Sequence, residues 1–104
     1  MADKLPDIVE QMRREHPDVW DAYNALGEAA SAAGPIDPNI QRLVKLAIAI
    51  GAQKEGAVHS HARRALKIGF TREELVQVAL LAITTLGWSS AMAALTWVQD
   101  VTDR

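Results

Sequence analysis

Apolar residues recur every three to four positions along most of the chain, and this spacing predicts α-helices. Prolines and glycines interrupt the pattern and divide it into about six segments. The expected helices cover about residues 5–16, 17–34, 38–53, 55–68 and 71–87, followed by a last helix that Ser89 or Ser90 would cap. The sequence therefore predicts an all-α, single-domain helical bundle over residues 1–104, with N-terminal helices in residues 1–34 and a core in residues 37–104.

Particular residues predict where several of these helices begin and end. Asp37 is placed to cap a helix that has Pro38 at its first position. Gly69 is expected to end the helix before it in a left-handed conformation. Thr71 and Glu74 have the spacing of a capping box, in which each side chain bonds the backbone of the other residue. These signals set the limits of the predicted core helices.

The segment between Gln77 and Thr84 contains only apolar residues. A helix at the surface shows one apolar and one polar stripe, so a helix that is apolar all round is expected to be covered all round. A chain of this size can surround few helices in that way, and a neighbouring subunit would cover the second face. The alternative is a central helix in a monomeric bundle. Gly87 is expected to bend or end this helix.

Composition narrows the possible functions. The chain has 104 residues, is 49% hydrophobic and carries a net charge of −2, with no basic run that would indicate nucleic-acid binding. The first ten residues lack the apolar core of a secretory signal and no apolar run reaches about 18 residues, so we expect a cytoplasmic protein with no membrane contact. The chain contains no cysteine, which excludes disulfides, thiolate metal sites and thiol redox chemistry. We expect no cofactor and no metal.

His61 is the first candidate for a chemical role because it lies on the apolar face of its predicted helix. Val58, Ala62, Ala65 and Ile68 share that face. The small side chains beside His61 leave room for a cavity. Burial among these residues should disfavour the charged imidazolium unless a carboxylate lies close.

His59 is expected to lie on the opposite side of the same helix. It is rotated by roughly 200° from His61 at about 3.6 residues per turn, so the two histidines cannot bind one metal ion from this helix. Its position one turn after Glu55 is typical of a surface histidine.

Residues 55–90 contain the most informative pattern of the chain. A helix with a histidine is followed by a run of the type A-L-x-x-G-x-T-x-E-E-L, and then by an apolar helix that ends at a glycine bend. The matching residues are His61, Ala65, Leu66, Gly69, Thr71, Glu73, Glu74, Leu75, Gly87 and Ala91, with a further likeness back to Asp37 through LVKLAIAIGA. The pattern resembles the carboxymuconolactone decarboxylase family, which includes the alkylhydroperoxidase D-like proteins. The resemblance implies an alkylhydroperoxidase D-like fold and an obligate homo-oligomer, commonly a trimer or a hexamer.

The resemblance also bears on peroxidase chemistry. In the peroxide-reducing branch of the family, a C-x-x-C pair precedes the histidine, and a glutamate in the preceding helix relays protons. The corresponding positions here are Lys54 and Ala57 for the cysteines and Arg42 for the glutamate. A thiol peroxidase needs a nucleophilic thiol and a resolving thiol, so this chain cannot run that cycle.

The decarboxylase branch lacks the cysteine pair and keeps the histidine. Its reaction removes CO2 from a carboxylated muconolactone, which needs a cation to hold the anionic substrate and an acid to protonate the resulting dienolate. The resemblance implies His61 as the acid/base group, because imidazole exchanges protons near neutral pH. Arg42 or Lys45 would anchor the substrate. We therefore expect a lyase that acts on a small carboxylated lactone or a related anion.

Two alternatives remain at the level of the sequence. His61 can instead be a core histidine with a hydrogen bond inside the bundle, which suits a non-catalytic oligomeric module that binds a ligand or a partner. Trp88 directly follows Gly87 and is the tryptophan best placed to line a pocket, whereas tryptophans more often fill cores or interfaces. We predict that His61 borders an internal or inter-subunit pocket together with Trp88 and with Arg42 or Lys45.

Overall fold

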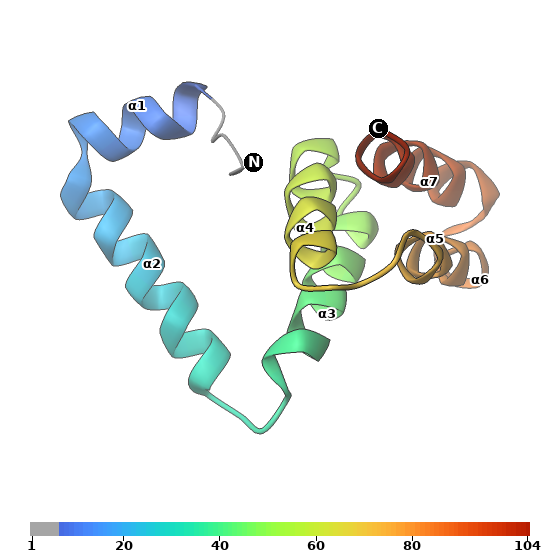
Figure 1. Ribbon diagram of the computed structural model, residues 1–104, viewed down its shortest axis with the longest axis horizontal. Helices are drawn as coiled ribbons and strands as arrows, with labels where there is room; N and C mark the ends of the chain where they lie inside the picture. Colours follow the sequence, from blue (N-terminus) through green and yellow to red (C-terminus); the bar gives the residue numbers. More distant parts are fainter. Residues whose placement is uncertain (1–6) are drawn as a thin grey trace. The chain divides into compact units, whose positions relative to one another are not determined.

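The computed structural model describes residues 7–104, which form seven α-helices and no strand (Figure 1). The chain divides into two compact units, Met1–Pro35 and Ile36–Arg104. The predicted all-α fold is confirmed, and residues 5 and 6 of the predicted first helix lie outside the described residues. None of the described helices combines the length and the apolar character that a membrane span requires.

The N-terminal unit contains α1 (Asp7–Glu15) and α2 (Pro17–Ala32), which pack against each other. Pro17 separates them because the residue before a proline is disfavoured in the helical conformation. Neither helix contains a buried residue. Val19, Tyr23 and Leu26 recur along one side of α2 and are all more than half exposed. Helix α1 therefore does not cover the apolar face of α2.

The second unit, here called the core unit, contains α3 (Pro38–Gly51), α4 (Glu55–Lys67), α5 (Arg72–Leu81), α6 (Ile83–Leu86) and α7 (Trp88–Thr102). Helix α4 packs against both α3 and α7, and α5 packs against α7 and α3 (Figure 1). The buried cluster at their centre consists of Leu46, Ala49, Ile50, Val58, Ala62, Ala65, Leu75, Ala79, Ala94, Val98 and Val101. Every helix of the unit except the single turn α6 contributes to it, so this cluster fixes the position of α4.

The predicted helix ends are confirmed by their hydrogen bonds. The Asp37 carboxylate accepts a bond from the backbone N–H of Asn39 at 2.8 Å and caps α3. The backbone N–H of Glu74 donates to the Thr71 hydroxyl at 3.1 Å, and the N–H of Thr71 donates to the Glu74 carboxylate at 2.9 Å, which completes the capping box of α5. Gly69 follows Ile68, the C-terminal cap of α4, and has a φ of 112°, as expected for a glycine stop.

The predicted helix over residues 71–87 is wrong in one respect, because it is broken at Ala82 into α5 and α6. The N–H of Ala82 donates to the carbonyl of Ala79, and the N–H of Thr85 donates to the carbonyl of Ala82, both at 3.1 Å. These bonds span three residues instead of four and tighten the chain at this point. The segment is also only partly covered, because Leu80 is 44% and Leu81 is 67% exposed.

The predicted end of this segment at Gly87 is correct, and the predicted start of the last helix is not. Gly87 has a φ of 94°, a conformation that glycine adopts without strain. Helix α7 begins directly after it at Trp88, so neither Ser89 nor Ser90 is the capping residue.

Candidate functional site

His61 lies in the middle of α4, on the side that packs into the core unit. Val58, Ala62 and Ala65 on the same stripe are fully buried, and they hold the backbone of His61 against the core. The His61 side chain is partly buried, and its Nδ1 atom is shielded from solvent. This nitrogen has no hydrogen-bond partner in residues 7–104. Buried polar atoms are nearly always paired, so the unpaired ring nitrogen sets His61 apart from an ordinary core histidine.

Burial and three neighbouring cations keep the imidazole of His61 neutral. Its pKa is lowered from 6.5 to about 4, chiefly because burial disfavours the charged form. Repulsion by Arg42, Arg64 and Lys45 lowers it further, in that order. The imidazole of the free protein is therefore uncharged at neutral pH and can accept a proton or a hydrogen bond.

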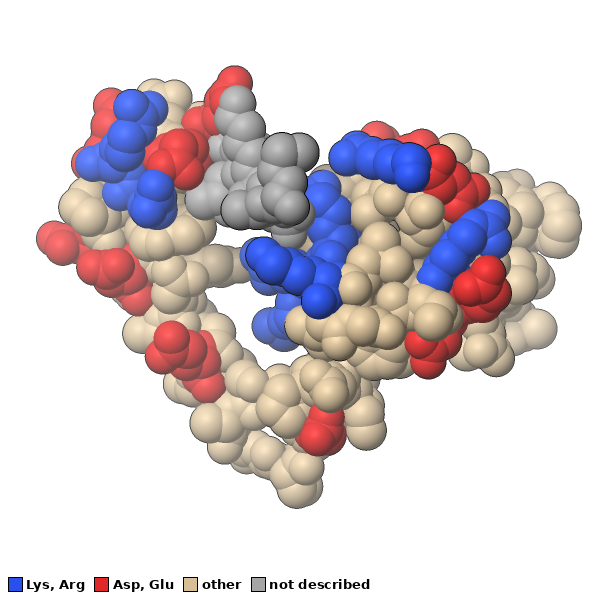
Figure 2. All heavy atoms as spheres, viewed as in Figure 1, with Lys and Arg blue, Asp and Glu red and all other residues tan. Residues whose placement is uncertain are grey.

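The three cations come from two helices that pack together. Arg42 and Lys45 are three residues apart on α3, and Arg64 is three residues after His61 on α4, so each pair shares a helix face. None of the three forms an ion pair or hydrogen bond with another described residue. Burial and repulsion by Arg64 lower the pKa of Arg42 below its ordinary value. Figure 2 shows Lys and Arg side chains grouped over α3 and α4.

The structure thus brings together three of the four predicted site residues and adds one. Arg42 and Lys45 each lower the pKa of His61, and so does Arg64, which sequence reasoning missed. Its spacing of three residues from His61 was a signal that could have identified it. An uncompensated group of cations beside a neutral imidazole is chemically suited to bind a small anion.

Trp88 is the predicted site residue that no described contact joins to His61. It is the first residue of α7 and is 66% exposed. The amide of Gln53 donates to the carbonyl of Ser90 at 3.2 Å, which places the start of α7 beside the loop between α3 and α4. His61 lies six residues after Glu55, the first residue of α4, or about 9 Å along the helix axis. That Trp88 lines the same pocket as His61 stays a prediction.

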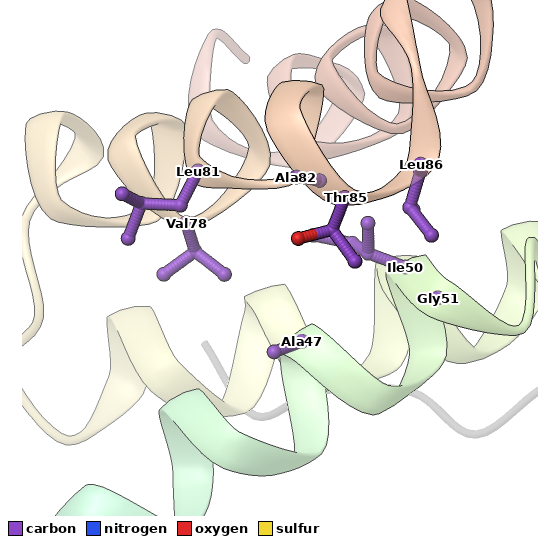
Figure 3. A pocket seen from close by; sticks show the side chains of 8 residues that line it. All are labelled: Ala47, Ile50, Gly51, Val78, Leu81, Ala82, Thr85 and Leu86. Atoms are coloured by element: carbon purple, nitrogen blue, oxygen red, sulfur yellow. The ribbon is translucent and has the colours of Figure 1, made fainter.

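A separate hollow lies between α3 and the α5–α6 segment (Figure 3). It has a volume of about 260 Å³ and is lined by Ala47, Ile50, Gly51, Val78, Leu81, Ala82, Thr85 and Leu86. Seven of these residues are apolar or glycine, and Thr85 supplies the single hydroxyl. This apolar groove contains no titratable side chain, so it is not an acid/base site.

The sequence and the fold of this chain match known proteins. The family model of the carboxymuconolactone decarboxylase family matches residues 17–100. A crystal structure of an apo carboxymuconolactone decarboxylase family protein from Legionella pneumophila superposes with a TM-score of 0.73 and 27% identity, over 90% of this chain and 87% of that one. A putative carboxymuconolactone decarboxylase from Burkholderia xenovorans superposes with a TM-score of 0.66 over 92% of this chain and 78% of that one, at 19% identity, and supports the fold alone.

One curated relative also matches in sequence. It is an uncharacterized protein of Haemophilus influenzae, 31% identical over 55 residues. The match covers 53% of this chain and spans about half of that protein, 49% of its length. The family match is broader, because it includes the whole of α3, α4 and α5 and with them His61 and the three cations around it. The chain belongs to the carboxymuconolactone decarboxylase family.

Proposed function

We propose that this protein is a lyase that removes CO2 from a small carboxylated lactone or a related anion, with His61 as the acid/base group. One observation carries the proposal. The shielded Nδ1 of His61 lacks a partner, and the three cations that act on this ring have no carboxylate of their own among the described residues. Such an arrangement favours a ligand that is both anionic and able to exchange a proton.

The cations would hold the substrate. Arg42 has a planar guanidinium that matches a carboxylate with two parallel hydrogen bonds. Lys45 and Arg64 would balance the remaining negative charge of a substrate that carries two carboxylates. Because none of the three forms an ion pair within residues 7–104, no ion pair of the described chain has to be broken when the anion binds.

The reaction needs positive charge that binds the anionic substrate and one proton for the carbon that loses CO2. The bond between the carboxylate and the ring carbon breaks, CO2 leaves, and the electron pair moves into the conjugated lactone carbonyl. The resulting dienolate then takes one proton on carbon, so that one carboxylate and one proton are converted into one C–H bond and CO2. His61 would donate that proton as a general acid.

His61 must first acquire this proton, because it is neutral in the free protein at pH 7. An anion bound beside Arg42, Arg64 and Lys45 offsets their repulsion and raises the pKa of His61. Substrate binding is then coupled to proton uptake from solvent. Binding of the substrate would therefore favour protonation of His61, the group that then protonates the dienolate.

The direct test is to incubate the purified full-length chain with a carboxylated muconolactone and to measure CO2 release. We expect His61→Gln to lower turnover by about 100-fold or more, as is typical for loss of a general acid. Arg42→Gln should act mainly on KM, because it removes an anchor. The control is Arg63→Gln, which removes a neighbouring cation on the side of α4 away from His61 and should leave turnover unchanged.

Two outcomes would contradict the proposal. Undiminished turnover in His61→Gln would remove the histidine from the mechanism. Tight binding of the lactone without CO2 release would instead favour a non-catalytic ligand-binding module.

We also propose that the protein is a homo-oligomer, a trimer or a hexamer, held largely by the helices in residues 75–101. Leu81 is 67% exposed and lines the apolar groove, and Trp88 is 66% exposed. Helix α3 also exposes Ile40, Val44 and Ile48, which follow one another at intervals of four residues. Burying the exposed part of each side chain would contribute about 1–2 kcal/mol. Several large apolar side chains exposed on one small unit are typical of an interaction site.

Sedimentation of a dilute sample tests this assembly. We expect a species of three or six chains for the wild type, and a shift to smaller species for Leu81→Asp, which places a charge in the apolar groove. Glu73→Asp, also on α5 and exposed, is the control that should keep the assembly. Sedimentation of the wild type as an 11.3 kDa monomer would contradict the proposal.

A further inference from the structure

A second cluster of titratable side chains lies on the side of α4 away from His61. Glu55 and His59 are one helical turn apart on α4, and Asp100 lies beside them in the last turn of α7. Each residue offers one ligand atom, and the three atoms lie within 4.8 Å of one another. The Nε2 atom of His59 is 3.0 Å from the Oδ2 atom of Asp100.

These separations are close to those around a bound metal ion. Zinc binds histidine nitrogen and carboxylate oxygen at about 2.0–2.2 Å, so two ligands of one ion are about 3.0–3.5 Å apart. His59 and Asp100 already have this separation, at which they form a hydrogen bond that the ion would replace. The carboxylate of Glu55 would have to move by about 1–2 Å, which a rotamer change of an exposed side chain supplies.

The backbones that carry the three ligands are held by the core. Val58 and Ala62 on α4 and Val98 and Val101 on α7 belong to one buried cluster. The ligands lie at the edge of this packed pair of helices, where the His59 side chain is 22% and the Asp100 side chain 45% exposed. Solvent can therefore reach the cluster. Arranging the three side chains around an ion would require little movement of the main chain.

The charges of the cluster favour a divalent cation. The two carboxylates give the cluster a net charge of −2 when the imidazole binds an ion in its neutral form, and the Glu55 carboxylate has no partner within residues 7–104. Two cations nearby oppose this attraction. Arg63 lies one turn after His59, and the Arg104 side chain donates to the backbone carbonyl of Asp100 at 2.8 Å. Neither arginine forms an ion pair with a ligand carboxylate within residues 7–104, so both carboxylates keep oxygens for an ion.

The donor types narrow the class of metal. A site with one imidazole nitrogen and two carboxylate oxygens suits Zn²⁺ and similar transition metals, whereas Mg²⁺ and Ca²⁺ prefer oxygen ligands alone. We propose that Glu55, His59 and Asp100 bind one divalent transition-metal ion, with water in the remaining positions. The ion connects the first turn of α4 to the last turn of α7. This site is separate from His61 and does not depend on the proposed decarboxylation.

The test is calorimetric titration of the metal-free, full-length chain, without an affinity tag, with Zn²⁺ and then with Mg²⁺. We expect one saturable Zn²⁺ site per chain, a much weaker response to Mg²⁺, and an increase in thermal stability on adding Zn²⁺. His59→Gln and Asp100→Asn should each weaken Zn²⁺ binding by at least about 10-fold and remove the thermal shift. NMR spectra should show the largest changes at Glu55, His59 and Asp100.

The matched control is His16→Gln, which removes an exposed histidine outside the cluster and should keep full affinity. Absence of saturable Zn²⁺ binding by the wild type would overturn the proposal. So would binding that survives both His59→Gln and Asp100→Asn, or binding that His16→Gln abolishes.

Discussion

Replacing His61 by glutamine is expected to remove part of the acid sensitivity of the fold. The pKa of His61 is lowered to about 4 in the folded chain by burial, and further by Arg42, Arg64 and Lys45, whereas its ordinary value is 6.5. Between these two pH values the unfolded chain binds a proton at this residue and the folded chain does not. The free energy of unfolding must therefore fall as the pH falls from about 6.5 to about 4.

The size of this effect follows from the two pKa values. From pH 7 to pH 5 they correspond to a loss of about 2 kcal/mol in the free energy of unfolding. The ring is only partly buried and solvent screens the three cations, so we expect about half of that, roughly 1 kcal/mol. Below pH 4 both states bind the proton and the loss reaches its limit.

Urea unfolding at pH 7 and at pH 5, at one protein concentration, measures how much the free energy of unfolding falls between the two pH values. Glutamine keeps a polar side chain at the position but does not titrate, so His61→Gln should lose about 1 kcal/mol less than the wild type between the two pH values. His16→Gln removes a different, exposed histidine and retains His61, so it should keep the wild-type loss. Equal pH dependence in the wild type and in His61→Gln would refute the reasoning.

Two further substitutions test the helix ends by urea unfolding at pH 7. Thr71→Ala removes the hydroxyl that accepts from the backbone of Glu74 and should lower the free energy of unfolding by about 1 kcal/mol; an unchanged value would mean that the box does not stabilise α5. Gly87→Ala forces a side chain into a φ of 94° and should destabilise by about 1–2 kcal/mol, whereas Gly56→Ala, inside α4 with open space around it, should be neutral or stabilising. Equal stability of the two alanine variants would contradict the conformational argument.

The helix ends could be predicted from the sequence because their causes are local. Asp37 caps α3 through the N–H of Asn39, two residues away, and Thr71 and Glu74 are three residues apart. The break at Ala82 could not be predicted in this way. It lies in an apolar run without glycine or proline, and it depends on how α5 and α6 pack against the rest of the core unit.

The candidate sites also differ in whether their residues are close in sequence or only in the fold. His61 could be identified because its apolar stripe and its motif are visible in consecutive turns of one helix. Asp100 is 41 residues from His59 in sequence, and only the packing of α7 on α4 brings the two side chains together. For that reason the sequence predicted no metal site, although Glu55 and His59 already had helical spacing. The lowered pKa of His61 likewise needs the fold, since Arg42 and Lys45 act from another helix.

The most direct test of the account is an NMR titration of the His61 imidazole, followed from pH 3.5 to pH 8 with and without a small lactone dicarboxylate. We expect a pKa near 4 in the free protein and a clear rise when the anion is bound, because the anion offsets Arg42, Arg64 and Lys45. Arg42→Gln should raise the pKa of the free protein and reduce the rise on binding. A free-protein pKa at or above 6.5, or a pKa that the anion leaves unchanged, would contradict the claim that His61 and these cations form one anion-binding acid/base site.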